Sequence, residues 1–358
     1  MEAILNREAN SRAIEYVLAQ GVAAWTKDGV IPPNPELGMA ARVCLPLRLR
    51  GELLAFVMVI DANGSVSAGD RLALAQAGES LIPHLAAELM DDDATLEPLV
   101  ADLLDPDPER RRAALAGAPR GLGEDFSVVS AVSLSVRRSE EADDAALAGM
   151  ALRRAMALPP PPGVIRRMGS AHQTSAVLLL GSHGPLTART MSEHARAMLA
   201  RARELSLGRL DVVAGLGPSV EGLARAFQTA EAAEAAARAA RLGFVGPISS
   251  WDDLGVYGPL MRIPAHQLRR DILPAELRLL LDVDRDDNLA STLRAYLDAG
   301  CSAQAAAEAL AIHRTTLYYR LRRVEELTGL DLSDGRVRVS LHVGLILLDI
   351  MQASRPNP

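Results

Sequence analysis

A basic stretch near the carboxyl end holds the side chains best suited to chemistry. Residues 311–323 contain four arginines and no aspartate or glutamate, a local charge of +4 in a chain whose formal net charge is −7. Threonine hydroxyls and two tyrosines lie among the arginines. Guanidinium groups bind phosphate oxygens, and arginine and threonine also hydrogen-bond to the edges of bases in the major groove. The pattern predicts a surface that contacts double-stranded DNA.

The spacing places most of these polar side chains on one side of a helix. At 100° per residue, Leu317, Leu321 and Val324 share a narrow sector that is expected to pack inward, while Tyr319 points the other way. The residues that we expect to contact DNA are His313, Arg314, Thr315, Thr316, Tyr318, Tyr319, Arg320, Arg322 and Arg323.

Their expected roles differ along the helix. Arg314, at its start, is the candidate for a bidentate contact to guanine, with a phosphate contact as an equal alternative. Residues further along the helix are expected to follow the DNA backbone. These are Tyr319, Arg322 and Arg323.

Three of the positions have a competing structural role. Arg320 lies beside the packing face, so an ion pair with Glu308 or Glu325 competes with a DNA contact. Thr316 is placed where it could cap the start of the helix. Tyr318 is expected to be half-buried, with its hydroxyl group reaching DNA.

The surrounding residues predict a helix-turn-helix that positions these side chains. Ser302 can cap a first helix of small residues over 303–310, and small side chains allow two helices to cross closely. Residues 311–313 form the bend, and a second helix runs over 314–327 to a stop at Gly329. The alternative is a basic, solvated helix in an ordinary helical domain.

Residues 312–329, IHRTTLYYRLRRVEELTG, resemble the C-terminal DNA-binding domain of the PucR/CdaR family, which comprises bacterial purine-catabolism and sugar-diacid regulators. They are also similar to the helix-turn-helix of Fis-type DNA-binding proteins. The resemblance covers residues 279–351. It implies a dimeric transcriptional activator with double-stranded DNA and its own second copy, in a homodimer or higher oligomer, as partners. A small-molecule effector and RNA polymerase are further candidate partners.

Composition and cysteine usage point to a cytoplasmic protein. At 358 residues the chain suggests two or three domains, and a pI near 5.6 restricts DNA affinity to a local patch. Cys44 and Cys301 form no CxxC pair, so no metal site and no cofactor are expected. The polar start of the chain lacks a signal-peptide core, and the longest apolar run, 343–348, is too short to span a membrane.

Residues 1–93 read as a small α/β domain. A helix is expected over 10–25 and a strand over 42–50, where Pro46 suggests a sheet edge. A second, more buried strand covers 53–60, and a long helix over 69–90 carries a leucine stripe. The hairpin followed by a long helix resembles the second half of a GAF domain, here truncated. It is expected to act as a sensor or as a dimerisation platform. The stripe consists of Leu74, Leu81, Leu85 and Leu89.

Residues 94–260 read as a linker helix followed by an α/β sandwich. Strands that alternate with helices predict a sheet covered by helices. Ser219 is expected to cap the last, alanine-rich helix, which ends at Arg241. The order resembles the middle domain of the same regulators, which has a GGDEF-like fold. The expected strands are 126–136, 175–181 and 210–215, and the expected helices are 143–157, 188–205 and 219–241.

The middle domain lacks the residues that a nucleotide cyclase needs. It has no acidic GGDEF turn to hold metal ions, and Gly215-Leu-Gly217 lacks the lysine of a P-loop. Three histidines lie on different elements and are expected to be surface or capping residues. We therefore expect no enzyme activity; a nucleotide-binding or cyclising enzyme, or a partner-binding adaptor without DNA affinity, are the competing hypotheses. The histidines are His172, His183 and His194.

Residues 261–358 read as an all-α DNA-binding domain. After a proline-bearing linker over 255–275, a short helix is expected over 276–281, and Asp287 should cap the next helix. A strongly apolar helix over 337–351 should be buried on several sides. The predicted fold class is thus multidomain α/β plus all-α: a GAF-like domain, a GGDEF-like sandwich and a helical helix-turn-helix domain.

Overall fold

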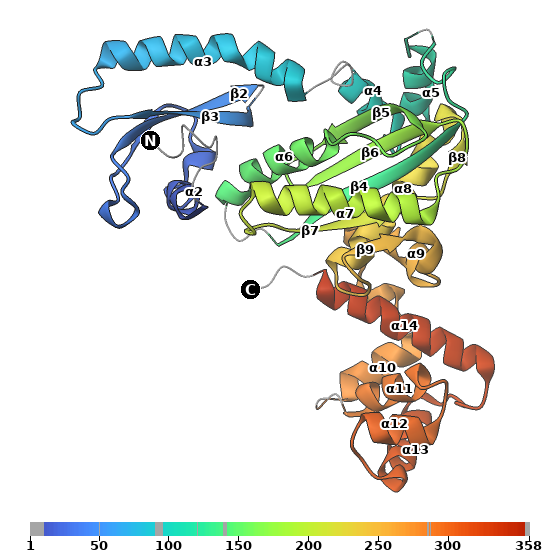
Figure 1. The fold of residues 1–358 in the computed structure, drawn as a ribbon. Coiled ribbons are helices and arrows are strands. Elements are labelled where there is room, and N and C mark those ends of the chain that lie inside the picture. Colours follow the sequence, from blue (N-terminus) through green and yellow to red (C-terminus); the bar gives the residue numbers. More distant parts are fainter. Residues whose placement is uncertain are drawn as a thin grey trace. The chain divides into compact units, whose positions relative to one another are not determined.

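A computed structural model of the chain describes residues 11–49, 51–89, 96–119, 121–138, 142–284, 286 and 288–354. It forms two compact units, Met1–Gly258 and Pro259–Pro358. The first unit holds a three-stranded and a six-stranded sheet, and the second is helical (Figure 1). The mixed α/β fold with a helical C-terminal region agrees with the predicted class.

The smaller sheet is antiparallel, with the order β1 (Gly29–Ile31), β2 (Arg42–Leu49), β3 (Glu52–Ile60). The prediction that Pro46 marks an edge strand is wrong, because β2 lies in the middle. The three residues of β1 pair only as far as Cys44, which faces Gly29. Pro46 therefore lies beyond this pairing, where no strand among the described residues pairs with β2 on that side, and a missing N–H is tolerated.

Two other expectations for the amino-terminal region need correction. The helix expected over 10–25 is α2 (Ser11–Leu18) followed by the short turn η1 (Val22–Ala24), because Gly21 adopts a left-handed φ of 71° between them. Residue 10 lies outside the described residues. The strand β3 is buried only at its start. Its last three residues, Met58, Val59 and Ile60, are 39%, 38% and 62% exposed.

The long helix α3 (Ala68–Leu89) covers one face of this sheet. At Gly78 an added Cβ would lie 2.7 Å from the side chains of Leu45 and Leu47, so the glycine lets the helix approach β2 closely. Leu81 is 44% exposed, and the expected leucine stripe is therefore interrupted on the solvent side. The side chain of Leu89 lies outside the described residues.

The larger sheet has the order β5-β6-β4-β7-β9, and β8 also pairs with β4. All pairs are antiparallel except β7 with β9. Three of the strands, β5, β8 and β9, were not predicted. In β5 two arginines and a glycine interrupt the apolar alternation, and β8 and β9 are only two and three residues long. The strands are β4 (Val128–Arg138), β5 (Val164–Ala171), β6 (Ser175–Ser182), β7 (Asp211–Leu216), β8 (Val220–Glu221) and β9 (Ile248–Ser250).

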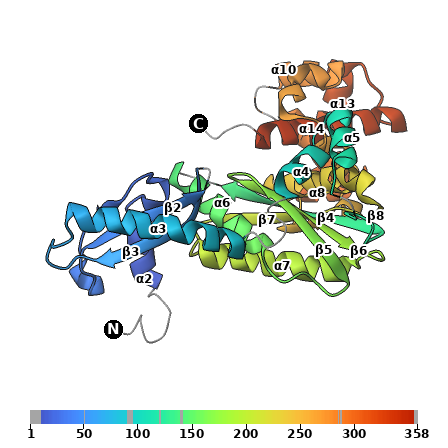
Figure 2. The ribbon, with the colours of Figure 1, turned by 90° about the horizontal axis from the view of Figure 1, so that it is seen from above.

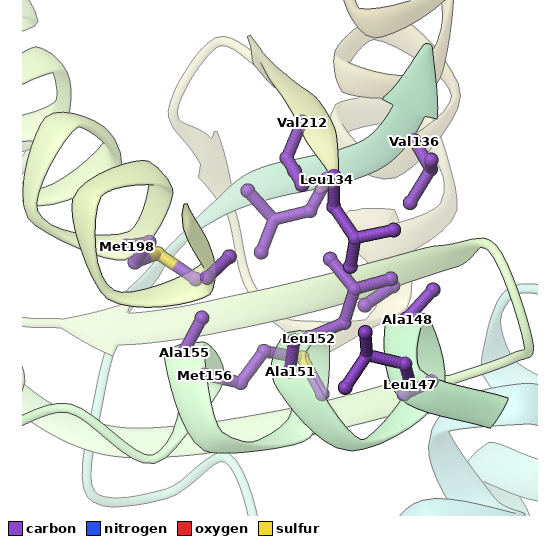
Figure 3. Packing of buried hydrophobic residues seen from close by; sticks show 14 of the residues in the cluster. Leu134, Val136, Leu147, Ala148, Ala151, Leu152, Ala155, Met156, Met198 and Val212 are labelled. Carbon is purple, nitrogen blue, oxygen red and sulfur yellow. The ribbon is translucent and has the colours of Figure 1, made fainter. Parts of the chain in front are cut away.

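Helices cover both faces of the larger sheet. Figure 2 shows α7 (Ala188–Leu205) and α8 (Ala226–Arg241) on opposite sides of it, and α6 (Ala142–Met156) lies on the side of α7. Alternate residues of β4 divide between the two cores, as the period of two in a strand requires. Leu134 and Val136 point toward α6 (Figure 3), and Ala131 points toward α8.

One hydrophobic core joins the two sheets of the first unit. Ile31, Cys44 and Leu53 from the smaller sheet belong to the same buried cluster as Leu147 and Leu152 of α6. Helix α6 therefore packs against both sheets.

Helix α4 (Glu97–Leu103) is tied to α6 by a partly buried ion pair and to β5 by a backbone hydrogen bond, and α5 (Pro108–Ala116) follows it. The Glu97 carboxylate accepts hydrogen bonds from Arg153 and from the backbone N–H of Ala171, both at 3.1 Å. Only 12% of the Arg153 side chain and 28% of the Glu97 side chain are exposed. The pair fixes the start of α4 at the edge of the larger sheet.

The glycine cluster at the end of β7 serves the packing of α8. A Cβ on Gly215 would lie 2.0 Å from the carbonyl oxygen of Ala233, and one on Gly217 would lie 2.1 Å from that of Thr229. The prediction that Ser219 caps this helix is wrong. Its Oγ lies 2.8 Å from the Oγ of Ser130, and α8 begins only at Ala226, after β8 and a short turn.

The second unit packs its helices around one core that includes Leu277, Leu293, Leu317 and Leu341. Residue 287, predicted to be a cap, lies outside the described residues. The carboxylate of Asp284 accepts from the first backbone N–H groups of α11 at 2.7–3.1 Å. Of the helices that the structure describes, none is long and apolar enough to cross a membrane. The main helices are α10 (Ala275–Val283), α11 (Asn288–Asp298), α12 (Ala303–Ala309), α13 (Arg314–Thr328) and α14 (Gly335–Ala353).

Candidate nucleic-acid interface

Helices α12 and α13 form the predicted helix-turn-helix. The Ser302 hydroxyl accepts a hydrogen bond from the N–H of Ala305 at 3.3 Å and caps α12. Ala311 turns the chain with a φ of 52°, and Ile312 is half-buried against the core. Gly329, at a φ of 70°, ends α13. The expected cap of the first helix, the bend and the stop are confirmed.

The inward side of α13 is also confirmed. Leu317, Leu321 and Val324 are 0%, 7% and 0% exposed, and they belong to the core that α11 and α12 share. Burial of this stripe fixes the rotation of α13 about its axis, so the opposite side must face solvent.

The start of α13 is capped by His313 rather than by Thr316. The Nδ1 of His313 accepts from the backbone N–H of Thr315 at 3.4 Å and lies 2.8 Å from the Thr315 Oγ1. Both residues are exposed, and Thr316 is half-buried. His313 and Thr315 thus form one hydrogen-bonded pair at the end of the helix that carries Arg314.

The four arginines of α13 differ in the partners they have. Arg314 and Arg322 are exposed and form no hydrogen bond or ion pair within the part of the chain that the structure describes. Arg323 pairs with Glu326 at 3.1 Å on the solvent side. Arg320 donates to the Thr292 hydroxyl of α11 at 3.3 Å, so it is held against the neighbouring helix.

The predicted alternative for Arg320, an ion pair with Glu308 or Glu325, is not formed in the structure. Glu308 instead accepts from Gln304 at 3.1 Å, and Glu325 accepts from the N–H of Leu332 at 2.9 Å. Both carboxylates are thereby engaged in local structure, Glu308 beside the bend and Glu325 near the end of α13.

The two tyrosines of α13 are unusually accessible for aromatic residues. Tyr318 is 56% and Tyr319 is 72% exposed, so Tyr318 is more open than the expected half-buried state. Exposed aromatic rings beside unpaired guanidinium groups are typical of a surface that binds another molecule.

Two further arginines, missed from the sequence, lie at the start of α14. Arg336 is exposed and Arg338 is half-buried, and neither pairs with an acid among the described residues. The sequence could have indicated them, because the helix begins with GRVRV and contains no acid before Asp349.

The three histidines that the sequence singled out in the first unit differ in burial. His194, expected at the surface, is 7% exposed, and its Nε2 has no hydrogen-bond partner. Burial lowers the pKa of His194, and the charge of Arg167 lowers it further, so both disfavour the charged ring. His172 and His183 are exposed, as expected. Within the described ranges, no group of three or more His, Cys, Asp or Glu could hold a metal ion.

Residues 289–347 match the family described as the PucR C-terminal helix-turn-helix domain. The chain is 26% identical over 343 residues to the carbohydrate diacid regulator of Escherichia coli (strain K12), covering 92% of this chain and 85% of that protein.

Two relatives from Bacillus subtilis (strain 168) match shorter segments. The proline-responsive transcriptional activator PutR is 37% identical over 97 residues, 26% of this chain and 24% of that protein. The purine catabolism regulatory protein is 31% identical over 86 residues, 24% of this chain and 16% of that protein. This chain thus spans about a quarter or less of the length of these two relatives.

Among solved structures, the regulator of polyketide synthase expression from Bifidobacterium adolescentis is 20% identical, over 72% of this chain and 96% of that chain. The TM-score of this match is 0.28.

Proposed function

We propose that this chain, a PucR/CdaR-type regulator and not an enzyme, controls transcription by binding specific DNA sequences through α12 and α13. One observation carries the proposal: the solvent side of α13 presents Arg314, Arg322 and Tyr319, and the two arginines have no partner within the described chain. The relatives that match along this segment are described as regulators, which supports the same conclusion.

In this proposal α13 lies in the major groove. Arg314 and the hydrogen-bonded pair His313–Thr315 sit at its N-terminal end and meet base edges, with Thr316 beside them. Arg322 contacts phosphate. The remaining candidates line or support the same surface: Tyr318, Tyr319 and Arg323 from the solvent side, and Arg320 through its bond to α11.

A single DNA-binding domain makes few contacts with DNA. Two of these domains, which we call the two heads, together bind with usable affinity. We propose a dimer whose helices α13 lie one DNA turn apart, about 34 Å, on a palindromic or repeated site. Residues 1–93 would form the GAF-like sensor or dimerisation domain, 94–260 the linker helix and GGDEF-like domain, and 261–358 the DNA-binding domain. The order β4-α6-β5-β6-α7-β7 supports the GGDEF-like assignment.

A small-molecule effector, contact with RNA polymerase, an activating role and a cytoplasmic location complete the proposal. A groove of about 580 Å³ between α4 and α5, lined by Leu99, Asp102 and Arg110 among others, is a candidate place for the effector. Binding there would shift the equilibrium between arrangements of the two heads.

The test is recovery of genomic fragments by the purified full chain, followed by titration of one recovered duplex and one random duplex over a range of salt concentrations. We expect preferential binding to the recovered duplex and a linear fall of log K with log salt. Absence of any preference at low salt would refute the proposal. The two competing hypotheses predict other results. If the chain were a partner-binding adaptor, it would bind an acidic protein and duplex DNA would not compete. If it were a nucleotide cyclase, it would convert GTP in the presence of magnesium.

A further inference from the structure

Helices α11 and α14 run antiparallel in a register fixed by two polar pairs. Arg294 of α11 donates to Asp349 of α14, and Asp298, further along α11, lies 2.8 Å from His342 Nε2 on α14. From the first pair to the second, the residue number increases on α11 and decreases on α14. The residues before His342 therefore continue past the end of α11, toward the turn 300–302 from which α12 begins.

The residues in that position are the two arginines at the start of α14. Asp334 caps the helix by accepting from the N–H of Arg336 at 2.7 Å. Neither Arg336 nor Arg338 has an acidic partner within the described ranges. Two cations in the first turn of a helix are unfavourable beside the positive end of its dipole, so these arginines do not serve the stability of α14.

This end of α14 borders the same core as α13. Val337, between the two arginines, and Tyr296 of α11 pack against the cluster that contains Leu317 and Leu321 of α13. Burial raises the pKa of Tyr296 most, and the charge of Arg338 lowers it, in keeping with this packing. The start of α14 and the helix α13 thus lie on one packed core.

We propose that the start of α14 is a second DNA-contacting element, in which Arg336 and Arg338 bind backbone phosphates beside the turn that leads into α12. The inference rests on the proposed function, because the duplex must first lie against α13. Charge identifies the molecule that binds here. Guanidinium groups without acidic partners are suited to bind the negatively charged phosphate backbone of the duplex. The element adds affinity and fixes the orientation of each head without reading bases.

The test uses the full chain with Arg336→Gln, Arg338→Gln and the double substitution. Each lost phosphate contact should reduce the slope of log K against log salt by about 0.9 and weaken binding about eightfold at 0.1 M salt. The loss should be equal on the recovered and the random duplex. Arg336→Lys should keep the slope, because a phosphate contact needs only the charge.

Arg269→Gln is the matched control. Arg269 is exposed and pairs with Asp271, and its neighbour Leu268 packs with Leu347 and Met351 at the other end of α14. This variant should bind DNA like the unchanged chain.

Three outcomes would overturn the inference: a salt slope of the Arg336→Gln and double variants equal to that of the control, a loss confined to the recovered duplex, or a failure of Arg336→Lys to restore the slope. Far-UV circular dichroism checks folding. Arg336 is exposed, so its variant keeps the test valid even if Arg338→Gln unfolds. If the unchanged chain bound no duplex at all, the proposed function would fail first, and the two failures are thereby distinguished.

Discussion

The arginines of α13 differ in what they can give to DNA, because some are already engaged. Arg314 and Arg322 have no partner in the described chain, whereas Arg323 must give up Glu326 before it binds phosphate. Exchange of one partner for another yields less than a new contact does. The sequence separates Arg314 and Arg320 by position, but only the structure shows that Arg323 is paired with Glu326 and that Arg320 donates to Thr292.

At the residue scale, Arg314→Ala should weaken binding to the specific duplex by roughly 1–3 kcal/mol and relax the preference at one base pair. The reason is loss of a bidentate contact at the start of the helix. Anisotropy titrations against a set of duplexes with single base-pair changes measure both effects.

Arg322→Ala is the companion variant, exposed and unpaired like Arg314. It should weaken binding to all duplexes alike and lower the salt slope by about 0.9. An equal loss on specific and random DNA for both variants would contradict the base-reading role of Arg314.

Ala311→Gly should stabilise the second unit. Ala311 has a φ of 52°, a left-handed conformation that costs an L-residue about 1–2 kcal/mol and glycine much less. After the greater chain entropy of glycine is subtracted, a gain of up to about 1 kcal/mol remains. Urea unfolding measures it. Ala305→Gly, at an exposed position inside α12, should instead destabilise by about 1 kcal/mol, and a similar sign for both variants would show that the left-handed bend is not strained.

At the scale of elements, the sequence predicts helices better than strands. The helix-turn-helix was predicted to within a residue or two, because Ser302 and Gly329 mark its ends chemically. Strand β5 was missed because its partners in the sheet, and not its own pattern, make it a strand.

Two of the remaining misses have different causes. His194 lies on the same helical stripe as Met191, Ala195 and Met198, so the period of α7 could have predicted that it faces the core. The cap at Ser219 and the role of the glycines depend on neighbours distant in sequence. Ser219 has the right type for a cap, but Ser130, from another strand, is its partner. The role of Gly215 and Gly217 in packing became visible only with α8 in place.

Gly217→Ala should destabilise the first unit by about 3 kcal/mol or more. The new Cβ would lie 2.1 Å from a backbone carbonyl oxygen of α8, so strand and helix must move apart. Urea unfolding followed by far-UV circular dichroism measures the loss. Gly184→Ala is the matched control: nothing lies within 4 Å of its Cβ position, and it should change stability by less than about 0.5 kcal/mol. Equal stability of the two variants would show that α8 does not pack this closely.

At the scale of the whole molecule, the core shared by both sheets predicts that the first unit unfolds as one body. Cys44 reports on this, because burial raises the pKa of its thiol to about 11. Below that pH the thiol stays protonated, so about one part in a thousand is thiolate at pH 8. In the native Cys301→Ser variant a thiol reagent should therefore react very slowly.

Labelling of Cys44 in that variant should rise with urea at the midpoint where the helical signal of the first unit is lost. The cause is that Cys44 packs in the same cluster as α6. Labelling at clearly lower urea would mean that the small sheet separates from α6 before the larger sheet unfolds.

The close packing between β7 and α8 also restricts how the sequence can diverge during evolution. Where a strand and a helix touch backbone to backbone through Gly215 and Gly217, a larger side chain on either one is accepted only if the other retreats. Substitutions in the two segments are therefore expected to be correlated among related proteins. Independent substitutions should accumulate on the solvent side of α8 instead.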